Sequence, residues 1–163
     1  MTIAELGSLG EFLASIAVFV TLVILIIQLR SAKAEVSNQL TQEIKHRNNQ
    51  AFYQLTQDPS LMEIHIRGQR DLATLSEQER ATWGLWLFTW ITQTEDGYVA
   101  RRKRAVDLDW VDSYMLGVAA VLRSPGGNEI WPRMRHWFDE GFVEDLEAKI
   151  VEDSTTWLDM LLG

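Results

Sequence analysis

The residues of this chain whose spacing is typical of metal chemistry are Glu43 and His46, which form a Glu-x-x-His pair. On a helix this spacing places a carboxylate and an imidazole on one face, as in di-iron carboxylate proteins. Such a site needs a second Glu-x-x-His pair and two further glutamates from other helices. The remaining histidines, His65 and His136, have no glutamate three residues before them. We therefore interpret Glu43 and His46 as part of a solvated helix face and expect no metal or other cofactor.

Other catalytic motifs are also missing from the sequence. It has no His-Glu-x-x-His pair, no Gly-x-Ser-x-Gly elbow and no cysteine. Gly126 and Gly127 follow Pro125 as a loop glycine pair, without the Lys-Ser/Thr that a phosphate-binding loop requires. The net charge of −8 argues against nucleic-acid binding, which needs surplus positive charge on some face. We expect a protein that is not an enzyme and has no nucleic-acid partner.

Small and polar residues recur with heptad spacing through the N-terminal part of the chain. Small residues let membrane helices approach closely, and Thr21 and Gln28 can form hydrogen bonds across such an interface. An unpaired amide facing lipid is costly, so Gln28 should point towards protein or water. We call this set the polar face. Its members are Gly10, Ala14, Ala17, Thr21, Ile24, Gln28, Ser31 and Glu35.

Two interpretations of the polar face remain open, besides coincidence. In the first, the helix packs on another copy of itself or on a helix of another subunit. In the second, several copies place Thr21, Gln28 and Glu35 around a water-filled pore.

Basic residues suggest where the chain contacts lipid headgroups. Arg30 and Lys33 follow the apolar segment, and the run Arg101-Arg102-Lys103-Arg104 ends a predicted helix. Cations near the membrane surface attract anionic lipids, and cations in the last turn of a helix also complement its dipole. Because Asp107 and Asp109 lie so near, we favour a capped, solvated helix end for the run at 101–104.

The element that must position the polar face is an apolar segment, Phe12 to Leu29, of eighteen residues without a charge. Thirteen of them are Leu, Ile, Val or Phe, which favours insertion by about 6 kcal/mol. As a helix it measures about 27 Å, close to the ~30 Å hydrocarbon core of a bilayer. Its N-terminal flank carries no Lys or Arg, unlike a signal peptide, so we expect a retained anchor.

The distribution of cations predicts the topology. The first ones, Arg30, Lys33, Lys45 and Arg47, all follow the segment. The positive-inside rule then predicts residues 1–8 outside, a transmembrane helix at 9–30 and a cytoplasmic domain at 31–163.

The rest of the sequence indicates an all-α fold. No proline lies between Leu9 and Thr56, which predicts one long helix with an apolar packing stripe at Val36, Leu40, Ile44, Phe52 and Leu55. Ser76 and Glu79 have the form of a capping box. Further helices are expected at 59–68, 77–104, up to Leu122 from a cap at Asp107 or Asp109, 131–138 and 142–151. Residues 83–91 should form the central buried helix, and residues 124–127 should form a turn.

The motifs Gln28-Leu29-Arg30 at the end of the apolar segment, 75–80 and 123–127 give the chain a resemblance to a family of uncharacterised, short bacterial single-pass membrane proteins. In that family two aromatic residues follow the Pro-Gly-Gly turn, where this chain has Trp131-Pro132. The resemblance implies the anchor-plus-domain architecture and no particular activity. It rests on Gly10, Thr21-Leu22, Gln28-Leu29-Arg30, Leu75-Ser76-Glu77-Gln78-Glu79-Arg80, Arg123-Ser124-Pro125-Gly126-Gly127, Trp131 and Phe138.

The sequence thus favours a homo-oligomeric scaffold or interaction protein of the bacterial inner membrane, with itself and membrane lipids as partners. The alternatives are a small channel lined by the polar face, and an accessory subunit whose helix meets another membrane protein.

Overall fold

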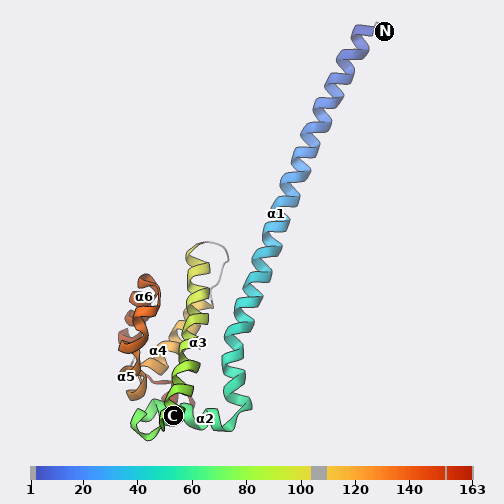
Figure 1. Cartoon of the computed structure of the whole chain (residues 1–163). Helices are drawn as coiled ribbons and strands as arrows, with labels where there is room; N and C mark the ends of the chain where they lie inside the picture. The colour runs from blue at the N-terminus through green and yellow to red at the C-terminus, as the bar shows by residue number, and fades with distance from the viewer. Residues whose placement is uncertain (1–2, 104–109, 153, 163) are drawn as a thin grey trace. The chain divides into compact units, whose positions relative to one another are not determined.

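The chain folds into helices, which confirms the predicted all-α class. The computed structural model describes residues 3–103, 110–152 and 154–162, and within them the side chains of 11, 12, 14–103, 110–152 and 154–159. No strand occurs in these ranges (Figure 1). The elements are α1 (Ile3–Gln57), α2 (Pro59–Arg70), the 3-10 turn η1 (Leu72–Thr74), α3 (Glu77–Arg102), α4 (Val111–Leu122), α5 (Pro125–Met134), the 3-10 turn η2 (Arg135–Trp137), α6 (Glu140–Glu152) and α7 (Trp157–Leu162).

The long helix predicted before Pro59 is confirmed as α1. It ends at Gln57 because the residue before a proline is disfavoured in the helical region. The Asp58 side chain then caps α2, accepting hydrogen bonds from the backbone N–H groups of Ser60 at 2.9 Å and Leu61 at 3.2 Å. The chain divides into two units, residues 1–40 and 41–163. We call them the first and second units.

The second unit has a core built around α3. Trp83, Leu87, Trp90 and Ile91 are all at most 1% exposed, as expected of the predicted central helix. Core side chains also come from the end of α1, from α4 and from α6; they are Ile44, Leu55, Met115, Val118, Phe142 and Leu146. The predicted stripe is therefore confirmed at Ile44 and Leu55. It is wrong at Val36, a residue of the first unit that is 62% exposed.

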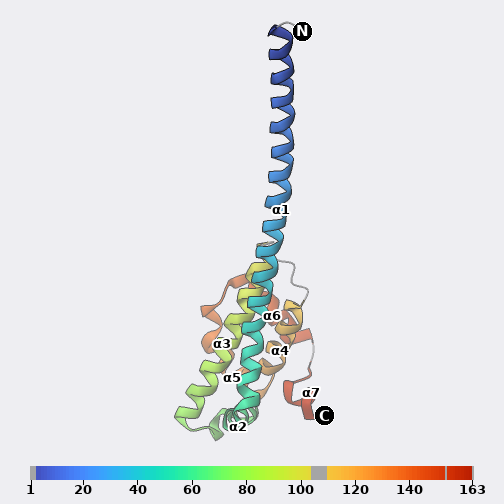
Figure 2. The same cartoon turned by 90° about the vertical axis from the view of Figure 1, so that its right-hand side faces the viewer.

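Buried polar groups attach the end of α1 to α3, which runs beside it in both views (Figures 1 and 2). The Asn48 side chain donates to the backbone carbonyl of Gln93 at 3.0 Å and accepts from the Thr94 hydroxyl at 3.2 Å. The Trp86 indole donates to the carbonyl of Ala51 at 3.2 Å. Because a buried polar group is costly to leave unpaired, these bonds fix the register between the two helices.

The predicted capping box at the start of α3 is confirmed. The Ser76 hydroxyl accepts from the Glu79 N–H at 3.3 Å, and the Glu79 carboxylate accepts from the Ser76 N–H at 2.8 Å. The backbone hydrogen bond from Ser76, together with Arg67, holds the pKa of Glu79 below its ordinary value.

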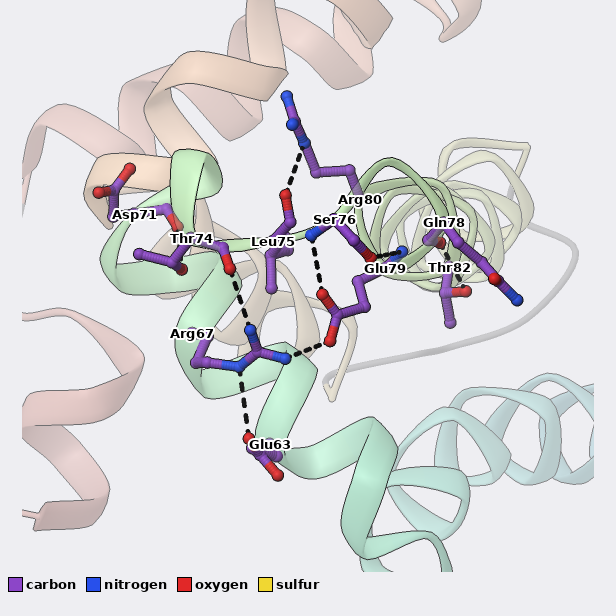
Figure 3. Close-up of polar contacts among 10 residues, drawn as sticks. All are labelled: Glu63, Arg67, Asp71, Thr74, Leu75, Ser76, Gln78, Glu79, Arg80 and Thr82. Atoms are coloured by element: carbon purple, nitrogen blue, oxygen red, sulfur yellow. Dashed lines mark hydrogen bonds and ion pairs between the residues drawn. The ribbon is translucent and has the colours of Figure 1, made fainter.

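Arg67 extends the capping box into a corner between α2 and α3, as Figure 3 shows. Its guanidinium donates to the carbonyl of Thr74 at 3.0 Å and to the Glu79 carboxylate. The Arg80 guanidinium donates to the carbonyl of Leu75 at 3.1 Å. The motif at 75–80 is therefore a structural corner, in which side chains satisfy backbone groups that no helix can pair.

The break predicted after Leu122 is confirmed, because α4 ends there, but the predicted turn at 124–127 is wrong in its extent: Pro125, Gly126 and Gly127 already belong to α5. Ser124 is the N-cap, and its hydroxyl accepts from the Gly127 N–H at 3.2 Å. Pro125 suits the first helical turn, where its missing N–H costs nothing. The glycines serve close packing: a Cβ on Gly126 would lie 1.8 Å from the carbonyl oxygen of Gly68. The Ser-Pro-Gly-Gly motif, which is typical of turns, therefore begins a helix here, and that helix packs closely against α2.

Two other helix starts differ from expectation. The helix expected from Trp131 begins at Pro125 and continues past Pro132 to Met134. Asp107 and Asp109, the expected caps of α4, lie outside the described residues, and α4 begins at Val111 after Trp110 with no side-chain cap. The sequence did not predict η1 or α7.

His65 is buried between α2 and α3 without a charged partner. It is 1% exposed, and its Nδ1 accepts a hydrogen bond from the Trp83 indole at 3.1 Å. Its Nε2 pairs with the Gln69 side-chain amide at 2.8 Å. Burial lowers the pKa of His65 to about 4. The folded protein therefore keeps this imidazole neutral at pH values where the unfolded chain protonates it.

Acidification should destabilise the second unit through His65. Between pH 7 and pH 5 the unfolded imidazole, with a pKa of 6.5, binds a proton that the folded one, with a pKa of about 4, excludes. The free energy of unfolding should fall by about 2 kcal/mol over that interval. Urea unfolding of the full-length protein in mild detergent measures it by tryptophan fluorescence, since all seven tryptophans lie between residues 83 and 157.

The matched variants are His65→Gln, which should shrink this pH dependence, and His46→Gln, which replaces an exposed histidine on α1 and should leave it intact. Equal pH dependence in all three proteins would show that another group is responsible.

Two glycine substitutions should have opposite effects on stability. Gly126→Ala forces a methyl group onto the Gly68 carbonyl and should cost about 3 kcal/mol. Gly84→Ala places its methyl 3.4 Å from the Ile130 side chain and should stabilise α3 by about 0.5 to 1 kcal/mol. Thermal melts of both variants test this, and a Gly126→Ala protein as stable as wild type would contradict the close packing of α2 and α5.

Candidate functional site

The candidate site lies on the N-terminal part of α1. This helix is long and apolar enough to cross a membrane, with an 18-residue window of mean hydropathy 2.1 in which no residue is buried. Each described side chain from Glu11 to Val36 is exposed, including Phe19 at 67% and Leu29 at 73%. An apolar surface that continues around a helix needs lipid or protein to cover it.

The structure places the described members of the polar face on this exposed stretch of α1. They are Ala14, Ala17, Thr21, Ile24, Gln28, Ser31 and Glu35. Gly10, the remaining member, lies outside the residues whose side chains are described. On a straight helix a heptad set drifts by about 20° per heptad, so the polar face winds slowly around α1. Two such helices keep it in contact only by supercoiling around each other.

The polar side chains of this face differ in their hydrogen bonding. The Thr21 hydroxyl donates to the carbonyl of Ala17 at 2.8 Å, within its own helix. The Glu35 carboxylate accepts from the Gln39 amide at 3.0 Å. Within the described part of the chain, Gln28 has no side-chain hydrogen bond. An amide has two donors and an acceptor, so the Gln28 side chain is able to form hydrogen bonds with a group outside the helix.

The basic run at the end of α3 is partly engaged by acidic side chains. Arg101 donates to the Asp112 carboxylate at 2.7 Å, which holds the pKa of Asp112 below its ordinary value. Arg102 pairs with Asp139 at 3.3 Å. Arg104 lies outside the described residues. These two arginines therefore connect α3 to neighbouring elements of the second unit.

The other candidates for headgroup contact are exposed. Arg30 and Lys33 lie on α1 directly after the apolar segment, and Lys103 follows the last residue of α3. Arg30 and Lys33 have the position expected of residues that meet lipid phosphates at a membrane surface.

Glu43 and His46 are exposed on α1, and the His46 ring pairs with the Gln50 side chain at 3.2 Å. Across the described residues, no three His, Asp or Glu side chains gather closely enough to hold a metal ion.

The structure adds one feature that the sequence analysis missed. A hollow of about 240 Å³ in the second unit is lined by Phe52, Trp90, Ser113, Tyr114, Gly117 and Trp157. The number of tryptophans is the one signal in the sequence, and it does not tell which rings meet.

Comparisons of the chain with protein-family models, curated proteins and solved structures find no match. The resemblance to a bacterial single-pass family stays a prediction. Function must therefore be argued from the chain's own residues.

Proposed function

We propose that the protein is a single-pass membrane scaffold that assembles through the N-terminal part of α1. The observation that carries this proposal is an apolar helix, exposed on all sides, whose Gln28 amide has no hydrogen-bond partner among the described residues. Lipid can cover the apolar side chains, whereas the amide calls for protein or water.

The location follows from the flanking charges. Insertion of the segment is worth about 6 kcal/mol, which Ser15, Thr21 and Gln28 offset only in part. Arg30 and Lys33 at its C-terminal side favour a cytoplasmic second unit, with residues 1–8 outside the inner membrane of a bacterium.

Assembly through the polar face would use both of its chemical features. Ala14 and Ala17 permit close approach of the helix backbones, and Gln28 amides from two copies can pair with each other. The second unit, with its own core, is then displayed in several copies for further contacts. A pore would instead turn Gln28 and Glu35 towards water, and an accessory subunit would pair Gln28 with a foreign helix.

Membrane anchoring should depend on the apolar segment. We expect the wild-type chain to stay in the membrane pellet after an alkaline carbonate wash. Leu22→Lys with Leu25→Lys should release it, because two central lysines cost about 6 kcal/mol in insertion. The control is Leu85→Lys with Leu116→Lys, which adds equal charge at exposed positions of the second unit. A wild-type chain that washes off the membrane would contradict the proposal.

Self-assembly should depend on Gln28. The protein expressed alone should form an oligomer in detergent, measured as the mass of the solubilised particle. Gln28→Leu combined with Thr21→Leu should weaken association by about three- to thirtyfold, because an interhelical hydrogen bond is worth about 0.6 to 2 kcal/mol. Ile26→Leu, a conservative change off the polar face, is the matched control.

Each outcome of this experiment separates the candidate functions. A monomer would point to an accessory subunit, and an oligomer unchanged by the double variant would remove the polar face as the interface. Single-channel recording on the reconstituted oligomer separates a scaffold, which stays silent, from a channel.

A further inference from the structure

The hollow in the second unit brings together four aromatic rings from four helices. Phe52 of α1 contacts the other three rings, with its ring centroid 5.0 Å from that of Trp90 of α3, 5.7 Å from that of Trp157 of α7 and 6.4 Å from that of Tyr114 of α4. A second hollow adjoins it along α1, lined by Phe52 together with Asn49, Tyr53 and Thr56. Because Phe52 lines both hollows, we refer to the two together as the groove.

A glycine keeps this groove open. A Cβ on Gly117 would lie 3.4 Å from Cζ2 of Trp90 and 3.8 Å from Cζ3 of Trp157, an ordinary contact that a methyl group tolerates. A longer side chain at position 117 would extend over the rings of Trp90 and Trp157. A large residue in place of Gly117 would therefore fill the hollow.

The groove also borders a hydrogen-bond donor that lacks an acceptor. Trp90 is 1% exposed, and its indole N–H has no partner within the described part of the chain. The ring edge nearest to Gly117 includes Cζ2, which is separated from Nε1 by a single ring carbon. Buried donors are nearly always paired, so an acceptor supplied from outside the chain would complete this one.

Among the residues that the structure describes, no charged side chain lines either hollow. The Tyr114 hydroxyl donates to the Asn49 side chain at 2.5 Å, and burial raises the pKa of Tyr114, which keeps the phenol neutral. An ion would find no counter-charge among these residues, whereas flat apolar molecules gain from ring stacking and edge contacts.

We propose that this groove is a binding site for a flat, uncharged aromatic molecule that carries a carbonyl group. The rings of Phe52, Tyr114 and Trp157 contact its faces and edges, and the Trp90 indole donates to its carbonyl oxygen. The site lies within the second unit and does not depend on how the membrane helix associates.

Calorimetric titration of the full-length protein in detergent tests the site with two probes, 2-acetylnaphthalene and 2-ethylnaphthalene. The probes differ in the carbonyl group, and empty micelles titrated in parallel correct for partitioning. We expect saturable binding of both, with the ketone about fivefold tighter because it gains one hydrogen bond. Trp90→Phe should retain binding and lose the preference for the ketone.

Two different variants that fill the groove are used, so that a folding defect in one of them does not decide the test. Gly117→Leu should abolish saturable binding, and so should Ser113→Leu, which enters from the exposed rim. Leu116→Ala, at an exposed position of the same helix, should bind as wild type does. Binding that survives both filling variants, or an absence of saturable binding in the wild type, would overturn the proposal. Equal affinity for the two probes would overturn the role of the Trp90 N–H.

Discussion

One constraint dominates this molecule: the apolar surface of the N-terminal part of α1 is not buried by the described residues of the chain, so lipid or another protein must cover it. In α1 every interior backbone group is paired within the helix, so lipid is an acceptable solvent for the backbone. The segment from Phe12 to Leu29 contains three polar side chains, and two of them also find acceptors on their own helix. Ser15 donates to the carbonyl of Phe12 at 2.8 Å, and Thr21 does the same to Ala17. A hydroxyl can pair with a backbone carbonyl of its own helix in this way, whereas the longer Gln28 side chain makes no such bond among the described residues. The apolar residues suit the helix to a lipid environment, whereas the Gln28 amide favours contact with a partner that can form hydrogen bonds.

The second unit differs from the exposed part of α1, because its core buries polar groups as well as apolar ones. Asn48 on α1 pairs with Gln93 and Thr94, and His65 on α2 pairs with Trp83 and Gln69. Each pair joins groups that would be costly to bury separately, and each fixes the register of neighbouring elements. The glycine contacts act with them, since α5 can lie against α2 only where Gly126 has no side chain. This unit therefore owes its arrangement to a few specific contacts as much as to its large aromatic core.

The sequence predicted what is locally encoded. Pro59, Ser76 and Glu79 act within one or two turns of chain, so the end of α1 and the start of α3 could be located in advance. The prediction of a turn through residues 124–127 was wrong in its extent because the same four residues can form a turn or begin a helix. The close approach of Gly126 to the carbonyl of Gly68, more than fifty residues away in the chain, is equally invisible to local reasoning. The prediction that Val36 belongs to the packing stripe was wrong because periodicity tells which residues share a face of a helix, and not whether another element packs on that face. The polar face was visible in the sequence because heptad spacing is a local property, whereas the groove was not, because its rings come from four helices.

The position of Glu35 limits how the polar face can be used. Ala14 and Ala17 lie in its N-terminal part and allow close approach, and Gln28 offers a hydrogen-bonding layer about three to four turns further on. One heptad after Gln28 comes Glu35, whose carboxylate is already bonded to Gln39. In a parallel assembly this position would bring like charges together, which is unfavourable in a tight interface. Close packing would therefore extend from Ala14 to Gln28 and loosen from Ser31 onward. The boundary falls beside Arg30 and Lys33, where the helix is expected to leave the hydrocarbon and where water can solvate the carboxylates. In the proposed assembly, the apolar segment and the favourable part of the interface would therefore end at the same place in the sequence.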